Sequence, residues 1–279
     1  MMTPMWKIAL GLASAMVLTA CEKPHEGRWL GYAEGEAAYI AAPQAGWLTA
    51  MKVKRGDWVK SGDLLFVLDD TSQTAARDSA EAQIAQAQGQ RAQAVATLDL
   101  ARRQLERQKG LLADAATSRQ AYDQAKSAYD AAVASIAALD AAEAGAKATR
   151  SGAAYVLAQR QVVALTTGRV QDVYFRQGEY APAMTAVVSV LPPDNVFVRF
   201  FVPEADFAAI HQGQKVTIHC DGCGAGLAAT ITFIASQHEY TPPVIFSNQS
   251  RSQLVFKVEA RAPGGLKINP GQPVDVDPL

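Results

Sequence analysis

The chain has 279 residues, 49% of them hydrophobic, and its 26 basic and 27 acidic side chains nearly cancel. This length can bury a substantial core and suggests two or three modules. The balanced charge excludes the strongly basic surface on which nucleic-acid binding depends. The sequence has no phosphate-binding glycine loop, nucleophile motif or paired-carboxylate arrangement. We therefore expect a protein that is not an enzyme and carries no cofactor.

The first 20 residues predict a bacterial signal peptide. Lys7 supplies a positive charge, and the apolar run 8–18 is too short for a comfortable membrane span. The run Leu18-Thr19-Ala20-Cys21 resembles the lipobox of bacterial lipoproteins, which implies acyl chains on Cys21 and a tethered periplasmic protein. A plain secretory signal with a chance cysteine is the alternative. Residues 21–37 are polar, and we expect them to form a linker.

One motif occurs twice, on the two sides of a long segment without proline. The two glycines of each copy are ten residues apart, and an acidic and an aromatic residue follow the second glycine. Such short strands with glycine turns predict two halves of one pseudo-symmetric β unit, residues 38–70 and 161–192. The copies are Gly46, Gly56, Asp57 and Trp58 in the first half and Gly168, Gly178, Glu179 and Tyr180 in the second.

Residues 71–160, between the two halves, predict a pair of long helices. They lie within a proline-free stretch and are rich in good helix formers, with a break at 113–118. Thr117 and Gln120 fit a capping box for the second helix. Heptad repeats of apolar and small residues predict that the helices pack side by side. Arms of roughly 40 residues make a hairpin about 60 Å long. The expected seam is Ile84, Arg91, Leu98, Leu105 and Leu112 with Ala87, Ala94 and Ala101, and Tyr122, Tyr129 and Ile136 with Ala125, Ala132 and Leu139.

The last segment, residues 193–279, predicts a separate β module with a short helical turn at 204–210. It contains a CxxC motif, Cys220 and Cys223, with His211 and His219 nearby. In an oxidising periplasm the expected state is a local disulfide. A redox pair or half of a metal site are the alternatives. The expected strands are 196–202, 215–218, 229–234, 254–260 and 273–276.

Split β halves around a helical hairpin resemble the periplasmic adaptors, also called membrane fusion or HlyD-like proteins, of Gram-negative tripartite exporters. The resemblance implies an α+β fold: a long antiparallel coiled-coil hairpin inserted in a split lipoyl/biotinyl-like β-sandwich, followed by a small β-barrel. The membrane-proximal domain of many adaptors is expected to be mostly absent.

The resemblance also implies that the hairpin tip contacts a TolC-like outer-membrane channel through Arg107, Leu111 and Ser118, which match the family's tip motif in type and spacing. An arginine can donate several hydrogen bonds, a leucine offers an apolar contact, and a serine hydroxyl can pair with exposed backbone. Taken singly, each also fits a simpler role: a solvated arginine, a seam leucine and a helix cap.

The further expectations follow from the same resemblance. The inner-membrane partner is an ABC permease, preferred because residues 239–245 and 254–260 look like those of ABC adaptors, and a proton-driven multidrug pump is the alternative. The copies form a ring, expected as a hexamer. The lipid anchor is placed in the inner membrane, although Glu22 after the cysteine leaves outer-membrane sorting open. A structural coiled-coil lipoprotein and a cofactor-carrier domain are the competing classes.

Overall fold

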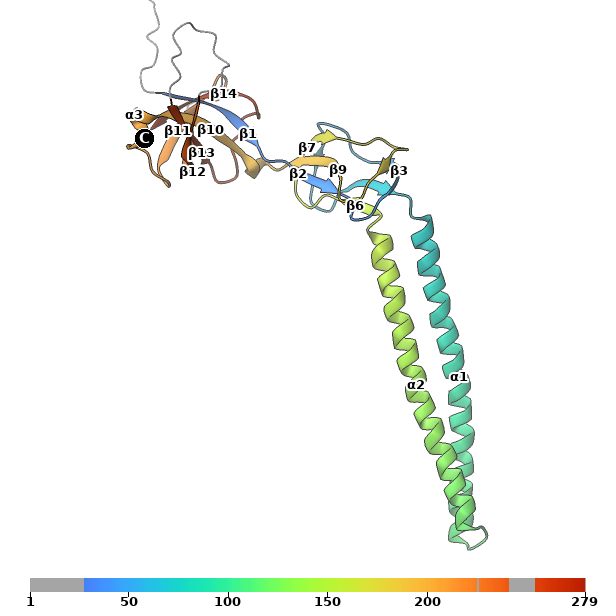
Figure 1. The fold of residues 1–279 in the computed structure, drawn as a ribbon. Coiled ribbons are helices and arrows are strands. Elements are labelled where there is room, and N and C mark those ends of the chain that lie inside the picture. The colour runs from blue at the N-terminus through green and yellow to red at the C-terminus, as the bar shows by residue number, and fades with distance from the viewer. Residues whose placement is uncertain (1–27, 225, 241–253, 279) are drawn as a thin grey trace, which may run out of the picture. The chain divides into compact units, whose positions relative to one another are not determined.

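The structure is a computed structural model and describes residues 28–224, 226–240 and 254–278 (Figure 1). The chain divides into two compact units, Ala37–Val190 and the combination of Met1–Glu36 with Leu191–Leu279. The predicted signal peptide, Cys21 and residues 22–27 lie outside the described residues. Among the described helices, none combines the length and the apolar character that a membrane crossing requires.

The β part of the first unit is a sandwich of two four-stranded sheets. The sheets have the strand orders β2-β9-β7-β4 and β6-β5-β3-β8. Their inner faces bury Leu48, Leu65, Phe66 and Val188, each nearly inaccessible to solvent. The strands are β2 (Ala38–Ala41), β3 (Gly46–Met51), β4 (Trp58–Val59), β5 (Leu64–Leu68), β6 (Gln161–Val163), β7 (Gly168–Val173), β8 (Tyr180–Ala181) and β9 (Ala186–Leu191).

The sequence repeat is a structural repeat as well. Strands β3, β4 and β5 begin 122 residues before β7, β8 and β9, and each strand has the same place in its sheet as its counterpart. The Gly56 N–H donates to the Val170 carbonyl at 2.9 Å, and the Gly178 N–H donates to the Leu48 carbonyl at 2.8 Å. Both glycines have a positive φ, +94° and +88°, which explains why glycine occupies both turns.

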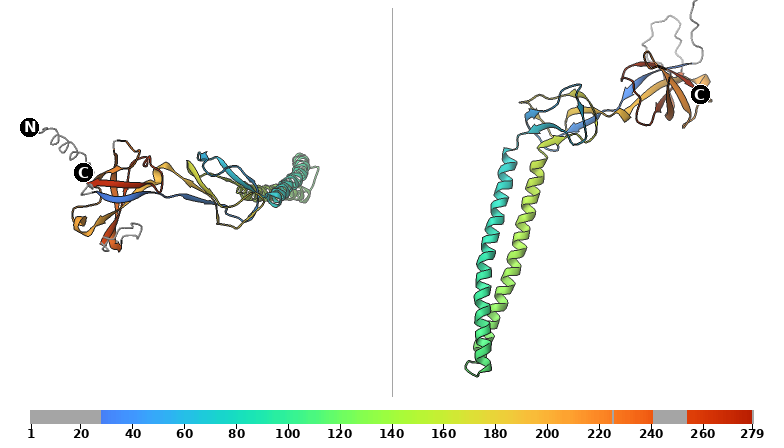
Figure 2. Two further views of the ribbon diagram at one scale, coloured as in Figure 1. Left: turned by 90° about the horizontal axis from the view of Figure 1, so that it is seen from above. Right: turned by 180° about the vertical axis from the view of Figure 1, so that it is seen from behind.

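The two long helices, α1 (Thr71–Ala113) and α2 (Arg119–Ala158), form an antiparallel hairpin and lie side by side in Figures 1 and 2. At about 1.5 Å per residue the longer arm measures about 60 Å. All of the predicted seam positions are buried or half-buried, whereas most other positions of the two helices are exposed. The predicted heptad seam is therefore confirmed.

Polar contacts between the helices fix the register of the hairpin. Arg91 occupies a seam position where an apolar side chain is usual, and its guanidinium pairs with the Asp140 carboxylate on α2. The hydrogen bond that Arg91 donates to Asp140, together with the negative charge of this carboxylate, raises the pKa of Arg91 above its usual value. Nearer the root, Arg150 Nε lies 3.0 Å from Glu81 Oε2. A polar group in a seam specifies one alignment, because any slip separates it from its partner.

The second unit is a closed barrel with the strand order β1-β10-β13-β12-β11-β14. Its core contains Phe200, Val198 and Ile218, and Trp29 stacks on Phe200 with the ring centroids 5.6 Å apart. Its elements are β1 (Trp29–Gly35), η1 (Pro193–Asn195), β10 (Val196–Pro203), α3 (Glu204–Phe207), β11 (Lys215–His219), β12 (Leu227–Tyr240), β13 (Leu254–Arg261) and β14 (Pro273–Pro278).

The barrel corrects one sequence-based expectation. The linker expected over residues 21–37 is wrong from Trp29 onward, because β1 pairs with both β10 and β14. The strand has few large aliphatic residues, and it is stabilised by the burial of Trp29 and Ala33 against strands more than 160 residues later in the chain. Such remote pairing leaves no local pattern. The expected α+β fold class, a long hairpin with β domains, is confirmed.

Candidate functional site

The hairpin tip is a five-residue turn that ends α1 with a left-handed residue. Ala115 has a φ of +57°, and its N–H donates to the Leu112 carbonyl at 3.1 Å. The next N–H, from Ala116, donates to the Leu111 carbonyl at 2.8 Å. This pair of bonds is the Schellman arrangement, in which glycine is the usual left-handed residue. An alanine at this position is strained, and strained backbone is often found at functional sites.

The second helix begins with Ser118 as its N-cap. Its side-chain oxygen accepts the Ala121 N–H at 3.2 Å. The predicted capping box at Thr117 is therefore wrong: the Thr117 hydroxyl lies 2.8 Å from Gln108 Oε1 instead, so it ties the turn to α1. Because Thr117 and Ser118 are both good capping residues, the sequence pattern could not decide between them.

The three residues of the predicted tip motif are all exposed. Leu111 has 42% of its surface accessible, whereas its neighbour Leu112 points into the seam. Arg107 lines a shallow hollow of about 380 Å³ on α1 and has no ion-pair partner in the described part of the chain. Ser118 accepts one hydrogen bond, and its hydroxyl hydrogen is still able to donate. The tip therefore presents a cation, an apolar side chain and a hydroxyl to solvent.

The hairpin root is held by a residue that sequence reasoning missed. Arg160 is 93% buried, and its guanidinium donates to the Ala45 carbonyl at 2.9 Å and to Gln44 Oε1 at 3.3 Å. Its own carbonyl accepts the Leu68 N–H at 2.8 Å. Arg160 therefore fixes the end of α2 to the first half of the sandwich. Its only sequence signal is a charged residue directly before an apolar strand.

Asp69 lies at the other side of the root, before α1. Its carboxylate accepts both the hydroxyl and the backbone N–H of Thr71, at 2.6 and 3.2 Å. These two bonds, helped by the positive charge of Arg160, lower the pKa of Asp69 from its usual value of 3.8. The carboxylate thus satisfies donors in the first turn of the helix.

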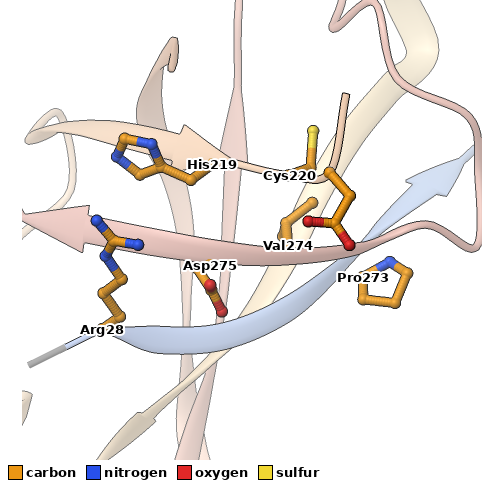
Figure 3. Close-up of a pocket in the computed structure, with 7 residues that line it drawn as sticks. Arg28, His219, Cys220, Pro273, Val274 and Asp275 are labelled. Atoms are coloured by element: carbon orange, nitrogen blue, oxygen red, sulfur yellow. The ribbon is translucent and has the colours of Figure 1, made fainter. Parts of the chain in front are cut away.

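The barrel carries the CxxC motif beside a polar pocket of about 240 Å³ (Figure 3). Cys220 and Cys223 form a disulfide, with their Cα atoms 5.3 Å apart. His219 Nε2 and Arg28 Nε lie 3.1 and 2.8 Å from the two carboxylate oxygens of Asp277, so the imidazole and the guanidinium share one carboxylate. Within the described ranges no three His, Cys, Asp or Glu side chains are grouped closely enough to hold a metal ion.

Comparisons with known proteins place this arrangement in a class. Residues 83–159 match the family described as "RND MFP, alpha-helical hairpin domain". The chain is 30% identical over 237 residues to the nickel-cobalt-cadmium resistance protein NccB of Alcaligenes xylosoxydans xylosoxydans, covering 85% of this chain and 53% of NccB. It is 34% identical over 172 residues to the multidrug resistance protein MdtA of Yersinia pseudotuberculosis, covering 61% of this chain and 36% of MdtA.

A solved structure shares the fold. The crystal structure of MacA from Actinobacillus actinomycetemcomitans matches with a TM-score of 0.71 at 20% identity, over 89% of this chain and 76% of that one. The architecture defines the class: a long helical hairpin inserted in a split β-sandwich, with a separate β-barrel. The chain belongs to the membrane fusion protein, or periplasmic adaptor, family. It spans about half the length of the curated relatives it matches.

Proposed function

We propose that the protein is the periplasmic adaptor subunit of a tripartite export or efflux system, and that it links an inner-membrane transporter to a TolC-like outer-membrane channel. The observation that carries the proposal is the long hairpin, whose polar inter-arm contacts fix its register and whose tip exposes Arg107, Leu111 and Ser118. The hairpin spans about 60 Å of the distance between the partners. Its role is to seal and couple, not to catalyse.

The tip supports the channel contact by its chemistry. The unpaired Arg107 guanidinium can donate to carboxylates or carbonyls at a channel mouth, and the exposed part of Leu111 can enter an apolar recess. Ser118 keeps a donor for exposed backbone. The register fixed by Arg91 and Asp140 presents these groups in one arrangement, which lowers the entropy cost of binding.

The transporter class has two candidates. The resemblance of residues 239–245 and 254–260 to ABC adaptors favours an ABC permease, but residues 241–253 lie outside the described residues. The description of the matching hairpin family names the RND class, which favours a proton-driven pump. We propose an inner-membrane transporter as the partner, with the ABC permease as the first class to test.

The membrane attachment and the copy number complete the proposal. Acyl chains on Cys21 hold the protein at the inner membrane, and several copies form a ring, expected as a hexamer. A Cys21→Ser variant is expected to move from the membrane pellet to the soluble periplasm, because the acyl chains supply the attachment. Continued pelleting of this variant after a salt wash contradicts the lipid anchor.

In-cell photocrosslinking tests the bridging role. A photoreactive residue at position 111 is expected to capture an outer-membrane channel, identified by mass spectrometry. Position 100 is the matched control, since Leu100 is also half exposed on α1 but lies three turns from the tip. A probe at the exposed barrel residue Leu30 is expected to capture the permease and so to name its class. If position 111 captures only copies of the chain, or the same adducts as position 100, the channel contact is wrong.

A further inference from the structure

The two glycine turns of the sandwich share one backbone plan but differ in the charge around them. Four exposed cations of the first half lie within six residues of the exposed Trp58, and a fifth, on β7 of the second half, is paired with it. We call these five the cationic turn. Arg169 lies opposite Trp58 in the β4–β7 pairing, and its Nε donates to the Gly56 carbonyl at 3.4 Å. The members of the cationic turn are Lys52, Lys54, Arg55, Lys60 and Arg169.

The cations of this turn are not neutralised within the described part of the chain. None of the five forms an ion pair there. The two nearby carboxylates serve the backbone instead: Asp57 accepts the Lys54 N–H at 3.0 Å and Asp63 accepts the Lys60 N–H at 2.7 Å. Five cations with two carboxylates leave a local excess of positive charge around an accessible tryptophan.

The equivalent positions of the repeat reveal whether the fold itself requires these cations. The counterparts of the five cations, 122 residues away in the repeat, include one cation, Arg176. The turn geometry is nevertheless the same, with a Glu179 carboxylate accepting the Arg176 N–H at 2.8 Å as Asp57 does for Lys54. The backbone therefore does not require the extra cations. Their counterparts are Tyr174 for Lys52, Arg176 for Lys54, Gln177 for Arg55, Pro182 for Lys60 and Trp47 for Arg169.

The surface at the second turn carries carboxylates beside aromatic rings. Trp47 and Tyr180 are both at least half exposed and meet edge to face, with their centroids 5.3 Å apart. The Asp69 N–H donates to the Trp47 carbonyl, and Asp70 follows with no side-chain partner in the described residues. We call Asp69, Asp70 and Glu179, with Trp47 and Tyr180, the anionic face. Its exposed cation is Arg176, while the guanidinium of Arg160 is buried and hydrogen-bonded.

We propose that the cationic turn of one copy binds the anionic face of the next copy in a head-to-tail contact. The inference rests on the proposed function, in which several copies surround one conduit. Each copy offers both patches, and they are different patches, so the contact can propagate around a ring. Each patch has an exposed tryptophan at its centre and charges around it, which is the composition of protein contact hot spots. The opposite charges favour contact between a cationic turn and an anionic face, whereas two cationic turns or two anionic faces repel each other.

Charge reversal in the full-length protein tests the contact by sedimentation velocity. Lys54→Glu with Arg55→Glu is expected to weaken self-association about tenfold or more, since it sets like charges against each other. The matched control is Arg176→Glu with Gln177→Glu, at the equivalent positions of the other turn. It adds negative charge beside the anionic face and is therefore expected to leave association unchanged or to strengthen it. Circular dichroism establishes that each variant is folded.

A mixing experiment gives the sharper result. Asp69→Asn with Asp70→Lys removes the net negative charge of the anionic face, while the asparagine keeps an acceptor for Thr71. Each double variant alone is expected to remain largely monomeric. An equimolar mixture of the two is expected to form dimers, because the unchanged cationic turn of one variant then meets the unchanged anionic face of the other. Three results would each overturn the contact: a mixture that stays monomeric, a parent chain that is monomeric at low salt, or unchanged association of the Lys54→Glu/Arg55→Glu variant. If one of these results is found while position 111 still captures a channel, the contact between copies is wrong but the adaptor role stands.

Discussion

The left-handed alanine at the hairpin tip predicts that Ala115→Gly stabilises the turn. An alanine at a φ of +57° carries a backbone cost of about 1–2 kcal/mol. Glycine removes that cost but adds freedom to the unfolded chain, which costs about 0.5–1 kcal/mol. The side chain of Ala115 is exposed, so little packing is lost. The net expected gain is about 0.5–1 kcal/mol in the local opening free energy.

Amide hydrogen exchange measures this gain at the tip itself. The N–H of Ala116 is protected by its bond to the Leu111 carbonyl, which opens when the turn opens. A gain of about 0.5–1 kcal/mol is expected to slow its exchange about twofold to fivefold.

Ala116→Gly is the matched control for the tip. It introduces the same glycine one position later, where φ is not positive. It is therefore expected to speed the exchange of the turn, because only the entropy cost remains. If Ala115→Gly leaves exchange unchanged or speeds it as Ala116→Gly does, the strain assigned to Ala115 is refuted.

Two further predictions concern the barrel and the hairpin root. Gly265→Ala is expected to destabilise the barrel by about 3 kcal/mol or more in urea unfolding, because its Cβ would lie 1.9 Å from the Pro193 carbonyl oxygen. Gly264→Ala shares the φ of +77° but meets open space, so it is expected to cost only about 1 kcal/mol; equal costs for the two variants contradict the close contact. The lowered pKa of Asp69 means that its contribution to stability is present above pH 3.8 and is lost as the pH falls through the folded-state value. Thermal melts at pH 6 and pH 3 are expected to show a destabilisation by Asp69→Asn that shrinks in acid, and a constant difference argues against the bonds from Thr71.

The features that depend on regular spacing could be predicted from the sequence. The glycine turns at 56 and 178 need a positive φ, so the two copies of the motif identified the two sandwich halves. The heptad seam could be predicted because one face of a helix is buried along its length. In both features the residue type is set locally: the turns require glycine for their backbone conformation, and the seam requires small or apolar residues because it is buried.

The features that sequence reasoning missed have no signal in the residues next to them. Strand β1 is stabilised by β10 and β14, which no local pattern near Trp29 announces. The left-handed conformation of Ala115 has no signal either, since alanine is otherwise the best helix former. The charge difference between the two turns was readable in the sequence, but only by aligning Lys54 and Arg55 with Arg176 and Gln177. It gained meaning once the structure established that the two turns have the same geometry.

The hairpin is inserted between two halves of the sandwich that meet at its root, so the length of its arms can change without altering the sandwich. The root is closed by the Leu68 and Arg160 main-chain bond, which does not depend on how far the arms extend. Removing one heptad from each arm between the root contacts and the tip keeps every remaining seam residue on its face, and it shortens the arm by about 10 Å. A series of variants with arms shortened or extended in heptad steps would therefore measure the distance that the protein spans in the cell.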